Sequence, residues 1–275
     1  MKINTSKWIR KIINLLVIVV ATVSIIPFLL MFLMATQDNQ TIFAGKILTL
    51  GHSLSDNFQT VVEAEYFRSF LNSIFISVSS TLLTVFFGAM AGFGFAKYEF
   101  KHKKLIYQLV ILTMLVPMEV GLVAFVWEMK ILHLSKTFLP LILPNMANAF
   151  SVFWMTQYIK DAFPYELIES GRIDGCTDMG IFLRMALPII KPAIFTLSVI
   201  SFLKYWNNYL LPMIMINDPK KFTVPLVIAS IGNMFVADYG ARLLAVAAGI
   251  LPIMIVFILF SRQITEGLAS GAVKG

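Results

Sequence analysis

Residues 161–192 read DAFPYELIESGRIDGCTDMGIFLRMALPIIKP, with long apolar runs on both sides. The first half of this stretch predicts a short helix. Pro164 suits the first turn of a helix, because its missing N–H needs no partner there. Tyr165–Ile173 can then be helical, and Asp174-Gly175 is a turn signal that ends the helix.

The second half of the stretch predicts another helix. Thr177 or Asp178 can cap it, and we expect Pro188 to stop it and Pro192 to start the next apolar run. Its apolar side is formed by Ile181, Phe182 and Met185. The product is a compact helix–turn–helix. Periodicity alone leaves two interpretations open, a docking surface for a partner and an ordinary amphipathic segment at a membrane surface.

Outward from this loop, the sequence is dominated by apolar runs. The 275 residues are 58% hydrophobic and only 13% charged, whereas soluble domains carry about 25% charged residues. A bilayer core needs roughly 20 apolar helical residues. Six stretches qualify, which predicts an all-α membrane protein with spans near Ile12–Ala35, Phe70–Gly94, Leu105–Trp127, Leu139–Tyr158, Ala193–Met215 and Ala241–Arg262. The first run is too long for a typical signal peptide, so we favour an uncleaved helix.

The distribution of basic residues predicts the orientation. With the N-terminus inside, fourteen of the 22 lysines and arginines fall in inside segments and six in outside segments. The positive-inside rule therefore places both termini in the cytoplasm. The expected organisation is a cytoplasmic N-terminus (1–11), a transmembrane domain (12–262) that contains the cytoplasmic loop 161–192, and a cytoplasmic tail (263–275). The long external segment Thr36–Ser69 is expected to be ordered.

Several function classes lack the residues that they need. The single cysteine, Cys176, excludes a multi-cysteine metal site, the three histidines lie in separate segments, and there is no nucleotide-binding GxxxxGK[ST] sequence. No nucleophile–base constellation supports a membrane enzyme. A secondary transporter would need membrane acids, and Glu119 is the one such acid in the six predicted spans.

The 161–192 loop resembles the EAA loop of permease subunits in bacterial binding-protein-dependent ABC importers. That family's pattern is roughly E-A-A-x-x-D-G-A, then a hydrophobic stretch, then L-P. Here Glu169, Asp174-Gly175 and Leu187-Pro188 match in order and spacing, while Ser170-Gly171 replaces the two alanines and Cys176 the last one. The replacements are all small, although a glycine weakens a helix by about 1 kcal/mol relative to alanine.

Other motifs resemble the carbohydrate-type members, of the kind of the second maltose permease subunit. They are Asn72-Ser73, Trp206-Asn207-Asn208 followed by Pro212, Phe222–Pro225, and the tail Glu266–Gly275. The resemblance implies the type I ABC importer permease fold in the bacterial plasma membrane. It also implies a second permease subunit, two ATPase subunits that hold ATP and Mg²⁺, and an extracytoplasmic solute-binding protein. This chain would carry no cofactor, be no enzyme itself and bind no nucleic acid.

The resemblance also implies site residues. The ATPase-coupling set is Glu169, Ser170, Gly171, Asp174, Gly175, Phe182, Leu187 and Pro188. Ile173 and Met179 are further candidates for apolar contacts. Glu169 could instead lie on a solvated helix face, and Phe182 could pack within its own subunit.

Candidate path residues come from the fourth and fifth runs. Charges inside a membrane usually face a cavity or a partner, and sugars are held by hydrogen bonds and aromatic stacking. These criteria select Lys204, Trp206, Asn207, Asn208, Asn145 and Asn148. Alternatively, Lys204 pairs with an acid of a partner chain and Asn207 locks helices together. Gly88 and Gly92 form a small-xxx-small pair that predicts close helix packing.

Overall fold

The computed structural model describes residues 7–232 and 237–272 of the chain. In these ranges, the regular structure consists of helices and one isolated β-bridge between Gly232 and Ala237. The chain divides into two compact units, residues 1–67 with 227–251, and residues 68–226 with 252–275. Of the predicted N-terminal segment 1–11, residues 1–6 lie outside the described residues. Of the predicted tail 263–275, residues 273–275 lie outside them.

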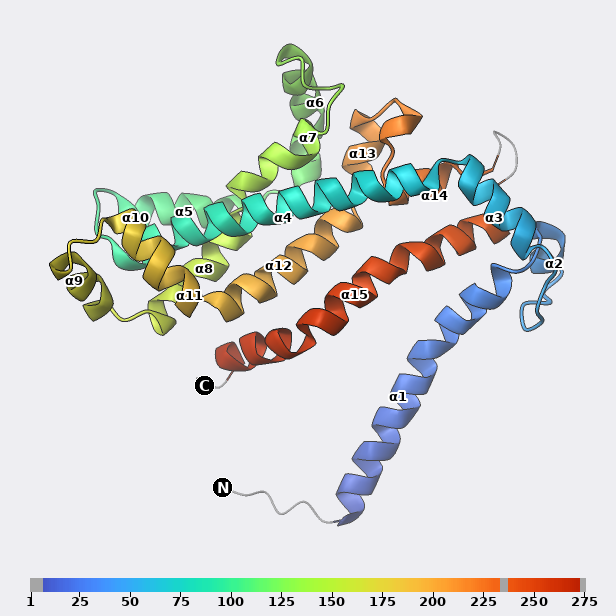
Figure 1. The fold of residues 1–275 in the computed structure, drawn as a ribbon, viewed down its shortest axis with the longest axis horizontal. Coiled ribbons are helices and arrows are strands. Elements are labelled where there is room, and N and C mark those ends of the chain that lie inside the picture. The colour runs from blue at the N-terminus through green and yellow to red at the C-terminus, as the bar shows by residue number, and fades with distance from the viewer. Residues whose placement is uncertain (1–6, 233–236, 273–275) are drawn as a thin grey trace. The chain divides into compact units, whose positions relative to one another are not determined.

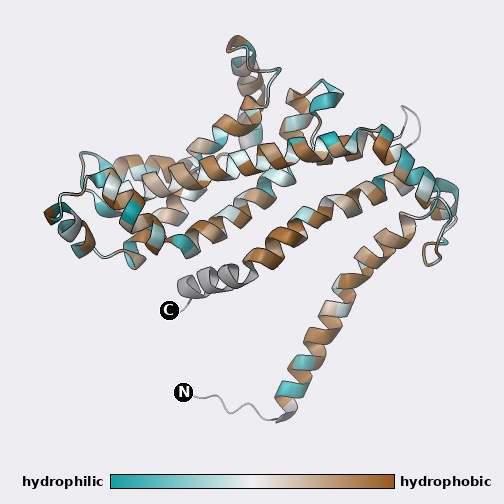
Figure 2. Cartoon of the chain, in the orientation of Figure 1, coloured by the Kyte–Doolittle hydropathy of each residue, from teal (hydrophilic) through white to brown (hydrophobic). Residues whose placement is uncertain are grey.

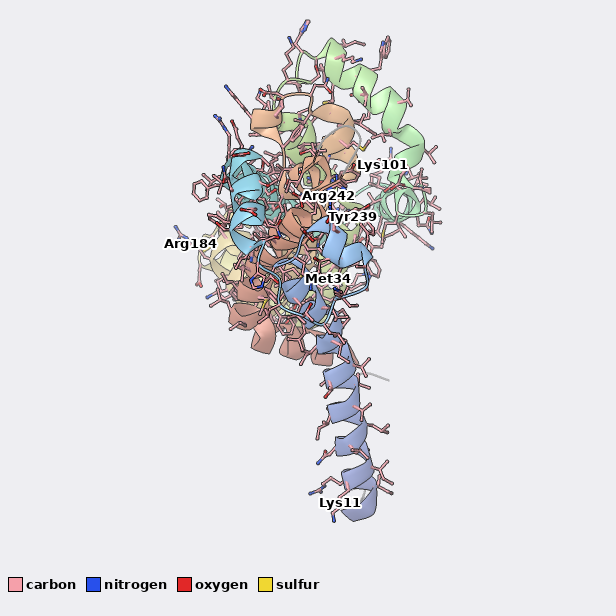
Figure 3. All side chains as sticks on the ribbon, turned by 90° about the vertical axis from the view of Figure 1, so that its right-hand side faces the viewer. Lys11, Met34, Lys101, Arg184, Tyr239 and Arg242 are labelled. Atoms are coloured by element: carbon pink, nitrogen blue, oxygen red, sulfur yellow. The ribbon has the colours of Figure 1, made fainter. Side chains whose placement is uncertain are left out.

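Unit 1 contains α1 (Lys7–Met34), α2 (Asn39–Phe43), α3 (Leu54–Glu63) and the first half of α15 (Tyr239–Ala272). α1 is apolar on all sides, and none of its most hydrophobic window is buried within the chain. Figure 3 shows its side chains projecting in every direction between the labelled Lys11 and Met34. A helix that is hydrophobic all round requires lipid or another protein as its surroundings, so α1 fits a membrane span.

The predicted order of segment 36–69 is confirmed. Asn57 on α3 donates hydrogen bonds to the carbonyls of Ala35 and Gln37, at 2.9 and 3.0 Å. Gln37 in turn donates to the carbonyl of Lys46 at 2.9 Å. These side-chain amides are buried and satisfy backbone carbonyls that secondary structure leaves free, so they tie the polar loop to the end of α1.

Unit 2 is built around α4 (Tyr66–Lys97), and Figure 1 shows α9, α10 and α11 gathered near one end of it. Its other elements are α5 (Lys103–Thr113), η1 (Met118–Gly121), α6 (Leu122–Ile131), α7 (Leu139–Ile142), η2 (Leu143–Ala147), α8 (Ala149–Ala162), α9 (Glu166–Ile173), α10 (Asp178–Ile181), a π turn (Phe182–Ala186), α11 (Leu187–Ile189), α12 (Lys191–Trp206), α13 (Leu210–Met215), η4 (Pro219–Lys221) and the start of α14 (Val224–Ser230).

Only part of the predicted six-span pattern appears as unbroken helices. Within the described residues, three helices are long and apolar enough to cross a membrane, in α1, α4 and α15, or up to four if a pair bent by 80° forms one span. Figure 2, coloured by residue hydropathy, shows the hydrophobic character of α1 and of the coloured part of α15. The presence of six membrane spans therefore stays a prediction.

The three remaining predicted spans are interrupted, two of them at a proline. α5 ends at Thr113 and Pro117 precedes η1, which splits the third run. Pro144 lies in η2 before α8, which splits the fourth run. α12 ends at Trp206 and α13 starts at Leu210, so the fifth run is also split. Proline lacks the N–H that an α-helix interior needs, a local effect that average hydropathy ignores.

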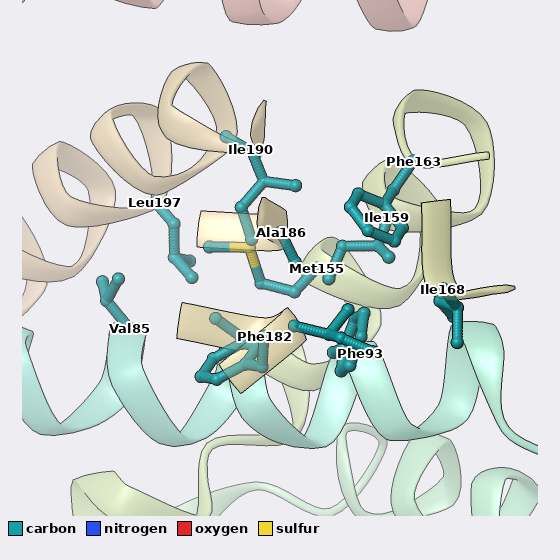
Figure 4. Close-up of a cluster of buried hydrophobic side chains, with 13 residues drawn as sticks. Val85, Phe93, Met155, Ile159, Phe163, Ile168, Phe182, Ala186, Ile190 and Leu197 are labelled. Carbon is teal, nitrogen blue, oxygen red and sulfur yellow. The ribbon is translucent and has the colours of Figure 1, made fainter. Parts of the chain in front are cut away.

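The main core of unit 2 lies where α4, α8 and the π turn meet. Figure 4 shows Phe93 of α4, Met155 of α8 and Phe182 of the π turn among its buried side chains. The predicted close packing at Gly92 is confirmed, because an added Cβ would lie 2.6 Å from the Met155 Cβ. The core therefore connects the 161–192 loop directly to α4.

Candidate functional site

The first helix of the 161–192 loop ends as the sequence predicts. α9 finishes at Ile173, and Gly175 adopts a left-handed φ of +77°. The amide of Gly175 donates to the carbonyl of Arg172 at 3.0 Å, and that of Cys176 to the carbonyl of Gly171 at 2.9 Å. This pair of bonds is a Schellman motif, which uses glycine because it has no Cβ penalty at positive φ. The turn is thus a defined structure.

The second helix starts as predicted but does not end as predicted. Thr177 caps α10 by accepting a bond from the Gly180 amide at 3.2 Å. Pro188, expected to stop the helix, lies instead in the first turn of α11, and helical structure continues to Ile189. The π turn before α11 shifts the bonding register by one residue, with the Leu187 amide donating to the Phe182 carbonyl. Such a shift accommodates a proline that α-helical bonding would not.

The predicted coupling residues divide into an exposed and a buried set. The exposed set is Glu169, Ser170, Asp174, Gly175 and Pro188. Ile173 is 87% exposed and Met179 50% exposed, although both are apolar. The carboxylates of Glu169 and Asp174 are exposed on the first helix and its turn. The tip of the loop therefore offers a mixed apolar and acidic surface.

Gly171 and Phe182 form the buried set. An added Cβ at Gly171 would lie 3.0 Å from Ile181 Cγ1, so the glycine allows α9 to pack tightly on α10. Phe182 is 2% exposed, and its ring centroid lies 5.5 Å from that of Phe93. Of the two interpretations left open for Phe182, contact with a partner and packing within its own subunit, the burial of its side chain favours the second. Its own subunit surrounds it, and Leu187 is half-buried.

A polar cluster at the loop escaped the sequence analysis. Arg172 forms a 3.2 Å ion pair with Asp178, which joins α9 to α10. Its guanidinium also lies 5.8 Å from the ring centroid of Tyr98, just after α4. Burial, followed by the nearby Asp178 carboxylate, raises the pKa of Tyr98 to about 12. The separation of these residues in sequence hides the cluster, since no local motif connects Tyr98 with Arg172.

The candidate path residues do not converge on one site. Trp206 is 2% exposed and stacks on Phe202 at 5.7 Å, so it is part of the core. Lys204 and Asn207 lie on the exposed side of the same helix end. The Asn207 side chain donates to the carbonyl of Leu203 at 2.9 Å.

The three other path asparagines have local structural bonds. Asn145 donates to the Leu141 carbonyl at 2.8 Å. Asn148 caps α8 by accepting from the Ser151 amide at 2.9 Å. Asn208 accepts from the Leu211 amide at 3.4 Å, at the start of α13. Each bond satisfies a backbone group near a helix break.

A row of buried hydroxyl groups on α4 is a second feature missed from sequence. Thr84 bonds to the Tyr205 hydroxyl at 2.6 Å and donates to the Asn145 carbonyl at 2.9 Å. The other members are Ser69, Ser73, Ser77, Ser80 and Thr81. Their spacing of three or four residues places them on one face of a helix. That periodicity is visible in the sequence and could have identified a buried polar face on this helix.

A cavity of about 470 Å³ lies between the loop after α6 and the end of α13. Its lining includes Lys130, Lys136 and Lys221, and Asp218 is its acidic member. The Asp218 carboxylate already caps η4 by accepting from the Lys220 amide at 3.0 Å. The cavity is therefore basic. Elsewhere in the described part of the chain, no cluster of three or more His, Cys, Asp or Glu residues could hold a metal ion.

Comparison with known proteins agrees with this architecture. Residues 84–268 match the family described as "Binding-protein-dependent transport system inner membrane component". The chain is 36% identical over 210 residues to the arabinooligosaccharides transport system permease protein AraQ of Bacillus subtilis (strain 168), covering 76% of this chain and 74% of AraQ. It is 31% identical over 255 residues to the lactose transport system permease protein LacG of Rhizobium radiobacter, covering 92% of each chain.

A solved structure shows the same fold. A chain of a bacterial ABC transporter involved in the import of the acidic polysaccharide alginate superposes with a TM-score of 0.79 at 19% identity, covering 94% of this chain and 98% of that chain. The matched family segment contains the 161–192 loop, both parts of the fifth run and most of α15. The chain therefore belongs to the family of inner-membrane components of binding-protein-dependent transport systems, as its loop and helix motifs predicted.

Proposed function

We propose that this chain is the permease subunit of an ATP-driven importer that moves a carbohydrate, such as a sugar, an oligosaccharide or a related polyol or glycerol phosphate, across the bacterial plasma membrane. The observation that carries the proposal is the acidic and apolar tip of the 161–192 loop, seated on the core of a membrane permease fold. The names of AraQ and LacG support a carbohydrate as the substrate class.

The proposed assembly contains a second permease subunit, two ATPase subunits and an extracytoplasmic solute-binding protein. ATP and Mg²⁺ would be held by the ATPases, since this sequence has no phosphate-binding GxxxxGK[ST] motif. Both termini and the 161–192 loop would be cytoplasmic, in line with the distribution of basic residues. The basic cavity near Lys130 would then face outside, where it suits an acidic surface of the solute-binding protein.

The loop would transmit movement mechanically. Ile173 and Met179 would insert apolar contacts into an ATPase, and Glu169 would bind one of its basic or hydroxyl groups. The Schellman turn holds these groups in position. Phe182 would carry the displacement into α4 through Phe93, because a packed core moves as a unit.

The test uses the transporter complex reconstituted in vesicles, with Glu169→Ala and Ile173→Ala as variants. Burial of an Ile side chain contributes about 1.5–3 kcal/mol, so we expect Ile173→Ala to weaken ATPase retention on the order of tenfold. Glu169→Ala should lower transport per ATP hydrolysed. Glu99→Ala is the matched control, because Glu99 is exposed, with only an i,i+4 bond to Lys103, and should behave as wild type.

Two results would refute the proposed function. Uptake that continues without ATP on a sodium or proton gradient would identify a secondary transporter. Normal transport and normal ATPase binding in both loop variants would show that Glu169 and Ile173 do not couple the permease to the ATPase. The substrate itself can be identified by a thermal-shift ligand screen on the cognate solute-binding protein.

Direct contact with the substrate is a separate proposal. Lys204 and Asn207 are exposed next to the break after α12, and they are the path residues best placed to meet a polar solute. Asn207→Ala should then change the apparent affinity for the carbohydrate without changing the amount of assembled transporter. An unchanged dependence of uptake on carbohydrate concentration would show that Asn207 caps the helix and does not contact the substrate.

A further inference from the structure

The joint between α12 and α13 borders a small cavity. Its volume is about 10 Å³, and its lining includes Ser77 of α4, Asn208 of the break and Thr223. The remaining lining residues are Ser73, Ile76, Leu141, Tyr205 and Pro212. A volume of roughly 10–15 Å³ accommodates the centre of one water molecule, so the cavity has the size for a single water.

Two hydroxyl groups of the lining have no hydrogen-bond partner among the described residues, those of Ser77 and Thr223. Their residues are 1% and 4% exposed. A buried hydroxyl without a partner costs about 1–3 kcal/mol. Both residues line the same cavity, so one water between them would satisfy both hydroxyl groups.

The other polar groups that line the cavity differ in whether they have a hydrogen-bond donor or acceptor left for a water molecule. Ser73 already accepts a bond from the Val224 amide at 2.7 Å, and the Tyr205 hydroxyl is bonded to Thr84. Asn208 uses its carbonyl oxygen to accept from the Leu211 amide, which leaves its NH₂ group as a donor. Ser77, Thr223 and Asn208 together match the two to four partners typical of a buried water.

We infer that this cavity is a binding site for one structural water molecule, which bridges Ser77 and Thr223 at the break of the fifth apolar run. The water connects α4, the α12–α13 break and the segment before α14. Non-helical backbone within a membrane is stable only where it is buried or lines hydrated space. A bridging water meets that requirement.

The test is a stability cycle on the full chain, purified in lipid nanodiscs with the subunits that it assembles with. The variants are Thr223→Val, Ser77→Ala and the double variant. The water predicts that each single variant lowers the apparent melting midpoint by about 2–4 °C. The double variant should lie close to the single variants, because both substitutions remove the same bridge and are therefore not additive.

Thr81→Val is the matched control. Thr81 is buried on α4 and its hydroxyl also has no partner among the described residues, but it does not line the cavity. Removing a hydroxyl that is unpaired should leave the midpoint unchanged or raise it. If Thr223→Val and Ser77→Ala behave like Thr81→Val and add independently, the water site is refuted.

A density map gives a direct second readout. The inference expects a solvent peak within hydrogen-bond distance of both hydroxyl oxygens in the wild-type protein, and its loss in the double variant. A map that resolves other internal waters but shows no peak here would overturn the inference, whatever the stability values are.

Discussion

Replacement of Gly92 by alanine tests the close packing of α4 against α8. The added Cβ would lie 2.6 Å from the Met155 Cβ, 2.9 Å from the Thr156 nitrogen and 3.0 Å from the Met155 carbonyl carbon. Non-bonded carbons prefer about 3.5–4.0 Å, so the helices must separate by roughly 1 Å. Backbone atoms cannot rotate away as a side chain could.

Gly94 provides the matched control on the same helix, since an added Cβ there meets nothing within 4 Å. Glycine to alanine in a helix interior stabilises by about 0.5–1 kcal/mol, and both variants gain this amount. Overpacking costs Gly92→Ala a further 1–3 kcal/mol or so. The two variants should therefore differ by about 1–3 kcal/mol.

The assay is the apparent melting midpoint of the purified full chain, followed by loss of the monodisperse peak in size-exclusion chromatography. At roughly 2–4 °C per kcal/mol, we expect Gly92→Ala to melt about 2–12 °C below Gly94→Ala. Equal midpoints for the two variants would refute the packing argument, because helix propensity alone predicts no difference between them.

Substitutions at three further positions test other contacts. Gly171→Leu should separate α9 from α10 and increase hydrogen exchange in the 161–192 loop, whereas Gly171→Ala should be nearly neutral, since a helix-propensity gain of about 1 kcal/mol offsets the tight approach to Ile181. Arg172→Gln removes the ion pair to Asp178, so proteolysis of the loop should increase at low salt and the difference should shrink at high salt; an unchanged cleavage rate would show that the pair does not order the loop. Thr84→Val removes the bond to the Tyr205 hydroxyl and the bond to the Asn145 carbonyl and should destabilise by about 1–3 kcal/mol, measured as a lower melting midpoint, and a midpoint at or above wild type would contradict the assigned bonds.

Local chemistry made the 161–192 loop predictable. The Asp174-Gly175 turn and the Thr177 cap depend on residues within five positions of each other, and both appear as expected. Pro188 was misjudged because the π turn before it has no sequence signal of its own. Average hydropathy found the apolar runs but could not detect breaks such as the one at Asn207.

The candidate site was less predictable because burial depends on distant partners. Phe182 and Trp206 are aromatic residues with plausible external roles in the sequence. Their neighbours Phe93 and Phe70, far away along the chain, place both inside the core. The lysine-rich cavity and the Tyr98–Arg172 contact also join segments far apart in sequence.

Local patterns, namely helix periods, turns and family motifs, were enough to identify the chain as an α-helical membrane permease of the binding-protein-dependent family. They also specified the Asp174-Gly175 turn and the Thr177 cap of the loop that we propose to meet an ATPase. The exposure of the loop residues could be read only from the packed helices, which leave Glu169 and Ile173 exposed and bury Phe182. Exposure depends on which helices pack together, and α4 covers one side of the loop with residues about 90 positions away.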